Sequence, residues 1–103
     1  MSNYLIELAK KIEMKKKENV NESYTSFLLE KGHKKCSEKF LEEVEEFKEA
    51  IANDSNIIHE SADVIYHFLV TLESRGIKFT DVLKELEKRK NISGFQEKES
   101  RSK

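Results

Sequence analysis

Apolar residues recur at helical spacing along most of the chain. In the first stretch, Leu5, Leu8 and Ile12 lie three or four positions apart, which places them on one face of an amphipathic α-helix. A second, shorter stretch begins after Ser23, a suitable N-cap, and stops at Gly32. These patterns predict an all-α protein.

Two long helices are predicted in the middle of the chain. The first covers about residues 34–52, and its apolar stripe consists of Cys36, Phe40, Val44, Phe47 and Ile51. The second follows a turn signal at residues 53–56, continues to Arg75 and has Gly76 available as its C′ residue. This helix is apolar nearly all round, which predicts burial on several sides. We expect the two long helices to pack antiparallel.

A last helix is predicted to begin at Thr80, an N-cap candidate, with Val82, Leu83 and Leu86 facing inward. The chain is therefore expected to contain about five helices. Residues 91–103 are polar and charged. We expect them to form either a flexible tail or a segment that folds over an anionic ligand.

The composition favours long helices with charged outer faces, since 37% of the residues are hydrophobic, 38% are charged and proline is absent. With 103 residues, the chain is expected to form one domain, 1–103, near the lower size at which a single core is comfortable. Pairing with a second copy would bury more surface. We therefore expect a homodimer in which the partner completes a four-helix-bundle-like core.

The charge balance argues against a general attraction to polyanions, because 19 basic and 20 acidic residues give a formal net charge of −1. We expect no nucleic-acid partner. No stretch approaches the roughly 20 apolar residues of a membrane span, so no membrane partner is expected either. The single cysteine, Cys36, rules out an internal disulfide and fits a reducing compartment. The expected location is the cytoplasm.

Acidic residues form the most distinctive pattern in the sequence. The motif Glu42-Glu43-x-x-Glu46 lies on one long helix, and Glu60-x-x-Asp63 lies on the next. Residues three apart project from neighbouring points of a helix, so antiparallel packing would bring these carboxylates together. They would repel one another unless a hard divalent cation joined them, and Mg²⁺ is the usual choice where phosphates are bound.

Helix phase distinguishes the acids from one another. Glu43 and Glu46 fall on the flank of the apolar stripe, whereas Glu42 lies nearer the far side. Glu60 and Asp63 share a flank of a largely apolar helix, where ionised carboxylates do not persist without partners. For the helix that carries Glu43 and Glu46, taken alone, the alternative to a metal site is a solvated acidic face. The predicted metal ligands are Glu43, Glu46, Glu60 and Asp63, with Glu42 at the margin of the site.

Two further polar residues lie beside the acids. His67 is one turn beyond Asp63 on the same flank, and both a hydrogen bond to a carboxylate or tyrosine and a contact with substrate are open to it. Lys39 precedes the acids, where it either neutralises them or contacts phosphate. A glycine-rich phosphate loop, a Cys/His metal spacing and a Ser-His-Asp arrangement are missing, which argues against P-loop and zinc mechanisms.

The acidic pattern resembles that of the MazG-like superfamily of all-α nucleotide pyrophosphohydrolases. Within it, three further stretches are similar to the phosphoribosyl-ATP pyrophosphohydrolase family, which catalyses the second step of histidine biosynthesis. These stretches are Ser23-Tyr24-Thr25 with Leu28 and Gly32, Ala62-Asp63-Val64-Ile65-Tyr66-His67 with Arg75-Gly76, and Ser93-Gly94-x-x-Glu97-Lys98-x-Ser100-Arg101. The chain departs from the family pattern at Leu41 and Val44, where small residues are common.

The resemblance implies Mg²⁺-dependent hydrolysis of phosphoribosyl-ATP between its α- and β-phosphates, giving phosphoribosyl-AMP and pyrophosphate, by a helical dimer. Glu42 or Glu46 is the expected acceptor of the proton from water. The expected substrate contacts are Tyr24, Lys39, Lys98 and Arg101. Two alternatives are a house-cleaning hydrolase of free nucleoside triphosphates and a non-catalytic helical dimer that acts as a binding module.

Overall fold

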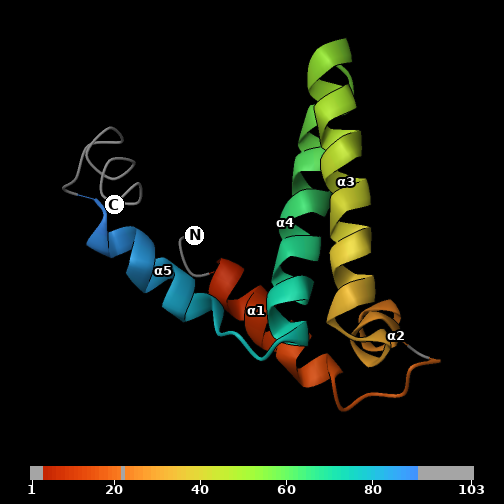
Figure 1. Ribbon diagram of the computed structural model, residues 1–103, viewed down its shortest axis with the longest axis vertical. Helices are drawn as coiled ribbons and strands as arrows, with labels where there is room; N and C mark the ends of the chain where they lie inside the picture. The colour runs from red at the N-terminus through yellow and green to blue at the C-terminus, as the bar shows by residue number, and fades with distance from the viewer. Residues whose placement is uncertain (1–3, 22, 91–103) are drawn as a thin grey trace.

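Two long antiparallel helices dominate the structure, a computed structural model that describes residues 4–21 and 23–90 (Figure 1). Within those residues the chain forms five α-helices and no strand. The helices are α1 (Tyr4–Lys15), α2 (Tyr24–Lys31), α3 (His33–Asn53), α4 (Ile57–Ser74) and α5 (Phe79–Lys88). The prediction of an all-α protein with two long antiparallel helices is confirmed.

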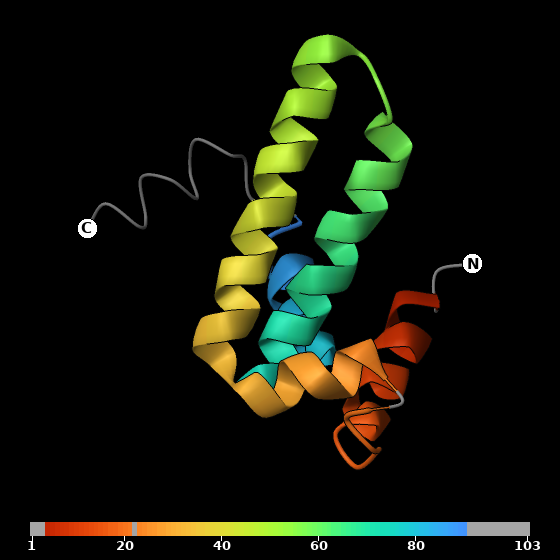
Figure 2. The same cartoon turned by 90° about the vertical axis from the view of Figure 1, so that its right-hand side faces the viewer.

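α3 and α4 form a hairpin whose closed end extends well beyond the other helices (Figure 1 and Figure 2). α2 crosses the open end of the hairpin, α1 packs against the lower part of α4, and α5 contacts α1 and extends away from the hairpin. We call the half of the hairpin near α2 the base and the half near the α3–α4 turn the tip. The molecule therefore has a covered base and a projecting tip.

Turn residues fix the ends of the helices. Ser23 caps α2, as predicted, because its Oγ accepts a hydrogen bond from the Ser26 N–H at 3.1 Å. Asp54 and Asn56 adopt left-handed conformations, with φ of 50° and 56°, in the tight turn between α3 and α4. Gly76, with φ of 70°, follows α4 in the conformation that favours glycine. These turns set the antiparallel course of the hairpin.

The hydrophobic core lies at the base. Its members are at most 2% exposed and come from α1, α2, α3 and α4: Ile12, Leu28, Cys36, Leu69 and Val70. Polar contacts join the same helices, since the Thr71 hydroxyl lies 3.2 Å from the Cys36 carbonyl oxygen and the Ser26 hydroxyl donates to the Lys15 carbonyl at 2.5 Å. The base is therefore the packed platform from which α3 and α4 extend.

The hairpin exposes apolar side chains from its middle to its tip. Ile58 is 86% exposed, Leu41 is 61%, Ile51 is 53% and Ile65 is 43%. The prediction that the fourth helix is buried on several sides is wrong for a single chain, because α1 and α2 reach only its lower turns. A contiguous set of exposed apolar groups marks an interaction surface. Although α4 is this apolar, no helix in the described residues is long and apolar enough to cross a membrane.

α5 is also less buried than its pattern predicted. It begins at Phe79, so Thr80 lies inside the helix and is not its cap. None of the residues of α5, all of which the structure describes, is buried. The inward-facing prediction is wrong for Leu86, which is 56% exposed, while Val82 and Leu83 are half-buried. The reason is that α5 packs on the rest of the protein through its first turn, where Phe79 contacts the core, and then extends away from it (Figure 1).

Candidate metal and nucleotide site

Carboxylates from α3 and α4 converge in the hairpin. Glu43 and Glu46 come from successive turns of α3, and Glu60 comes from α4. One oxygen atom from each of the three lies within 4.8 Å of the others. The antiparallel course of the two helices brings these residues together. The cluster offers oxygen atoms alone, which is the donor set that hard cations such as Mg²⁺ prefer.

The surroundings of this cluster disfavour ionised carboxyl groups. Burial, together with the hydrogen bond and the negative charge of Glu46, raises the pKa of Glu43 to about 7. Burial also raises the pKa of Glu60, again helped by the charge of Glu46. The Oε2 atoms of Glu43 and Glu60 are buried and have no hydrogen-bond partner among the described residues. Oxygens in this position are unfavourable unless a proton or a cation reaches them.

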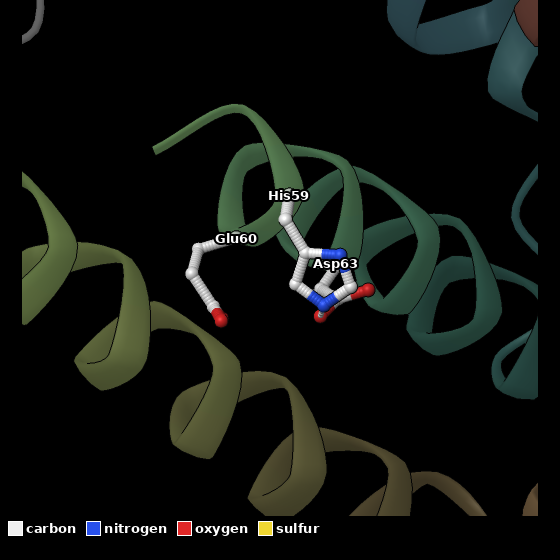
Figure 3. Close-up of side chains that lie close together, drawn as sticks. All are labelled: His59, Glu60 and Asp63. Atoms are coloured by element: carbon white, nitrogen blue, oxygen red, sulfur yellow. Dashed lines mark ion pairs between the residues drawn. The ribbon is translucent and has the colours of Figure 1, made fainter. Parts of the chain in front are cut away.

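A second group of candidate ligands lies on α4 alone (Figure 3). Atoms of His59, Glu60 and Asp63 lie within 4.8 Å of one another, and His59 Nε2 is 3.3 Å from Asp63 Oδ2. Glu60 extends toward α3, whereas the His59 ring lies against Asp63 (Figure 3). Glu60 thus belongs to both groups. The Asp63 side chain is 39% exposed, so the structure places it at the open edge of the site.

Glu42 and Lys39 lie outside both groups. The Glu42 side chain is 62% exposed, and its Oε1 is 3.6 Å from Lys39 Nζ. An exposed ion pair of this kind adds little to stability, so neither residue is needed to hold the fold together. The charge of Lys39 nevertheless acts on His67, one of the buried residues of the site. Both residues are therefore available to a ligand at the margin of the acids.

Two tyrosines and a histidine form the wall of the site toward the base. His67 is 7% exposed, and its ring centroid is 5.4 Å from that of Tyr66 and 6.2 Å from that of Tyr24. The Tyr66 hydroxyl hydrogen-bonds to the buried hydroxyl of Thr25. Tyr24 itself is 54% exposed. A planar group that enters from this side would therefore meet the ring of Tyr24 first.

A polar hollow of about 340 Å³ opens on the other side of the acids, toward the α3–α4 turn. Glu46 and Glu60 line the hollow together with polar residues of the turn, among them Asn53 and Asn56. The site therefore has aromatic groups toward the base and polar groups toward the tip.

Not every functional candidate matches the sequence-based selection. His59 was not among the predicted ligands. It lies four residues before Asp63, and this spacing places the two side chains on one face of a helix. That spacing was the signal in the sequence that could have identified His59. The predicted substrate contacts Lys98 and Arg101 lie outside the described residues.

The raised pKa of Glu43 predicts that the metal-free protein is more stable in weak acid than at neutral pH. Because this pKa rises from an ordinary 4.5 to about 7, the folded state binds more protons than the unfolded state between those pH values. The contribution of Glu43 to the free energy of unfolding is therefore present below the lower value and lost as pH rises through the upper one. The loss should reach up to about 3 kcal/mol.

Urea unfolding in the presence of EDTA, repeated at several pH values, measures this loss. Glu43→Gln removes the titrating group, so the plot of the free energy of unfolding against pH should become flatter between weak acid and neutral pH. A variant whose curve runs parallel to that of the unmodified protein would show that Glu43 is not the group responsible.

Comparisons with known proteins identify the family. The family model for phosphoribosyl-ATP pyrophosphohydrolase matches residues 5–90. A phosphoribosyl-ATP pyrophosphatase of Ruegeria pomeroyi is 46% identical over 101 residues, which cover 96% of each chain. A protein of the same name from Dinoroseobacter shibae is 46% identical over 99 residues, which cover 94% of this chain and 97% of the relative.

A third relative, phosphoribosyl-ATP pyrophosphatase 1 of Bradyrhizobium diazoefficiens, is 51% identical over 81 residues, which cover 77% of this chain and 76% of the relative. No solved structure gives a significant match. The family model and the relatives agree with one another and with the motifs in the sequence. This chain belongs to the phosphoribosyl-ATP pyrophosphohydrolase family.

Proposed function

We propose that this chain hydrolyses phosphoribosyl-ATP between its α- and β-phosphates, releasing phosphoribosyl-AMP and pyrophosphate as the second step of histidine biosynthesis. The family and the names of the relatives support this reaction. The structural observation that carries the proposal is the convergence of Glu43, Glu46 and Glu60. We further propose that residues 1–103 act as one cytoplasmic domain.

Mg²⁺ is the proposed cofactor. Glu43, Glu46 and Glu60 would hold it, and Asp63 would contribute from the open edge. The buried Oε2 atoms of Glu43 and Glu60, which have no hydrogen-bond partner among the described residues, support a cation at this point. When bound, Mg²⁺ supplies neutralisation of the phosphates and stabilisation of charge on the leaving pyrophosphate.

Glu42 or Glu46 is the proposed acceptor of the proton from the attacking water. Glu46 belongs to the acid cluster, whereas Glu42 is exposed and paired with Lys39. A carboxylate that is fully used as a metal ligand is a poor proton acceptor, because the cation favours its ionised form. Glu42 is therefore the better base if Glu46 is a ligand, and Glu46 is the better base if it is not.

The two ends of the site support one orientation of the substrate. The exposed ring of Tyr24 offers a surface for the base or ribose. The polar hollow beside Glu46 and Glu60 has room for the phosphates that leave. Lys39 would neutralise phosphate charge from the margin, and Lys98 and Arg101 are proposed as further phosphate contacts from outside the described residues.

We also propose a homodimer formed through the face of the hairpin opposite the acids. Helix phase places Leu41 of α3, and Ile58 and Ile65 of α4, on that face, with Ile51 of α3 at its edge. All four side chains are exposed in the single chain. Burying each of them against a second hairpin would contribute about 1.5–3 kcal/mol. The resulting four-helix bundle would leave the acids accessible on its outside.

The acidic residues of the site are tested by Glu60→Gln and Asp63→Asn, each of which replaces a carboxylate by an amide of similar shape. Turnover of phosphoribosyl-ATP should fall by more than about 100-fold, since losing groups that only support metal ligands already costs 10–100-fold. Far-UV circular dichroism should remain helical. Glu45→Gln, which removes a charge from an exposed position of the same helix as Glu46, is the control and should retain full activity. Near-normal turnover in either site variant would remove the acids from the mechanism.

The substrate is tested by offering the purified protein phosphoribosyl-ATP, ATP and a panel of altered deoxynucleoside triphosphates, each with Mg²⁺. We expect the highest kcat/KM for phosphoribosyl-ATP, with pyrophosphate as the released product. A preference for a free deoxynucleoside triphosphate would identify a house-cleaning hydrolase. Failure to hydrolyse any member of the panel, in a protein that is folded and binds metal, would support the non-catalytic helical dimer.

The dimer is tested by Ile58→Glu, which places a charge at the most exposed side chain of the proposed apolar interface. Sedimentation equilibrium should show a dimer for the unmodified protein and a monomer for this variant. Met14→Glu is the matched control, because Met14 is 68% exposed but lies on α1 and outside the proposed interface. A monomeric unmodified protein, or a dimer that Ile58→Glu leaves intact, would refute this interface.

A further inference from the structure

His67 is a buried polar residue whose hydrogen-bonding capacity the fold leaves unused. It is 7% exposed, and the rings of Tyr66 and Tyr24 lie beside it at 5.4 and 6.2 Å between centroids. Its Nδ1 is buried and has no hydrogen-bond partner among the described residues. Its Nε2 lies 3.9 Å from Oε1 of Glu43. A buried imidazole with so few partners is costly, so its position calls for an explanation other than packing.

The two nitrogens of His67 face different surroundings. A neutral imidazole carries one N–H, on either Nδ1 or Nε2. An N–H at Nδ1 would be a buried donor without a partner, which is the rarer and more costly arrangement. The tautomer with the proton on Nε2, pointing toward Glu43, is therefore favoured.

Glu43 shows the complementary arrangement. Its Oε1 faces His67. Its Oε2 is buried and has no hydrogen-bond partner among the described residues. The Glu43 carboxyl group is also part of the acid cluster. The 3.9 Å between Nε2 and Oε1 is longer than a hydrogen bond. A shift of about 1 Å in the Glu43 carboxylate would close it.

We propose that His67 is a positioning residue for the metal site: its Nε2–H donates to Oε1 of Glu43 and orients the carboxylate so that Oε2 faces the cation. This proposal rests on the proposed metal site of Glu43, Glu46 and Glu60. His67 is not proposed as a catalytic residue, because its burial beneath Tyr24 and Tyr66 keeps it away from a bound substrate. Hydrogen bonds of this kind fix the geometry of a ligand and raise its affinity for metal.

Two substitutions separate the donor from the ring. His67→Gln keeps an N–H at the position of Nε2 but removes the aromatic ring, whereas His67→Phe keeps a ring between the tyrosines but removes the donor. If His67 positions Glu43, the glutamine variant retains the affinity for metal and the phenylalanine variant loses it. If His67 only fills space, the order is reversed. His67→Asn, whose amide lies at the position of Nδ1, should behave like the phenylalanine variant.

The measurement is the dissociation constant of Mn²⁺, used as a probe without nucleotide and followed by calorimetry or by the loss of its free electron-paramagnetic-resonance signal. We expect His67→Phe and His67→Asn to weaken Mn²⁺ binding by about 10–100-fold. His67→Gln should stay within a few-fold of the unmodified protein. His33→Gln, which alters an exposed histidine at the start of α3, is the control and should leave binding unchanged.

The outcomes that overturn the proposal are distinct. Unchanged Mn²⁺ affinity in His67→Phe and His67→Asn would overturn the role of His67 while leaving the metal site intact. Equal losses in His67→Gln and His67→Phe would assign the effect to the shape of the ring and would also overturn it. Absence of Mn²⁺ binding to the unmodified protein would refute the metal site, and the role of His67 with it. Thermal unfolding of each variant confirms that the compared proteins are folded.

Discussion

Mutual repulsion among carboxylates between α3 and α4 is the constraint on which the site depends. The hairpin holds Glu43, Glu46 and Glu60 together, although each would be better solvated apart. The core at the base keeps the two helices at this separation, so part of the stability of the base maintains an unfavourable cluster. An arrangement of this kind persists where a ligand offsets the repulsion, because a ligand that binds only the folded state adds its binding free energy to folding.

One stripe of α4 links the core at the base to the exposed face of the tip. Ile58, Ala62, Ile65 and Leu69 follow one another three or four residues apart, which aligns them along the helix. Leu69 is 2% exposed because α1 covers the base, whereas Ile58 is 86% exposed because nothing in the described chain covers the tip. A surface that packs on the tip would therefore extend an existing core. The acids occupy a different side of the same helices, so the extension need not cover them.

Local signals made most of the fold predictable. The caps and turns at Ser23 and Gly76, together with the apolar periodicity, placed the helices to within a few residues. Helix phase also placed Glu43 nearer to α4 than Glu42, which is the relation that the structure shows. These features depend on neighbours in the sequence, which is why a single sequence reveals them.

The remaining features depend on tertiary contacts that periodicity does not specify. A repeated apolar pattern shows which residues share a face, but not how far along the helix a neighbour extends. This is why Leu86 was predicted to face inward, and the helix that carries Ile58 was predicted to be buried on several sides, although both side chains are exposed in the chain. The pairing of His59 with Asp63, by contrast, follows from a spacing of four residues on one helix and was open to prediction from the sequence.

The site lies where the packing between α3 and α4 changes. On the base side of the site, the ring centroids of Phe40 and Phe68 are 6.1 Å apart. On its tip side, the buried residue of α3 is the small Ala50. A cation bound by Glu43 and Glu60 would therefore join the helices where large apolar contacts give way to small ones. The same two helices carry the exposed apolar face. A change in the separation of α3 and α4 at the metal site would therefore also change the shape of that face. Metal binding and association through the tip would then be coupled, and the coupling free energy would act equally in both directions.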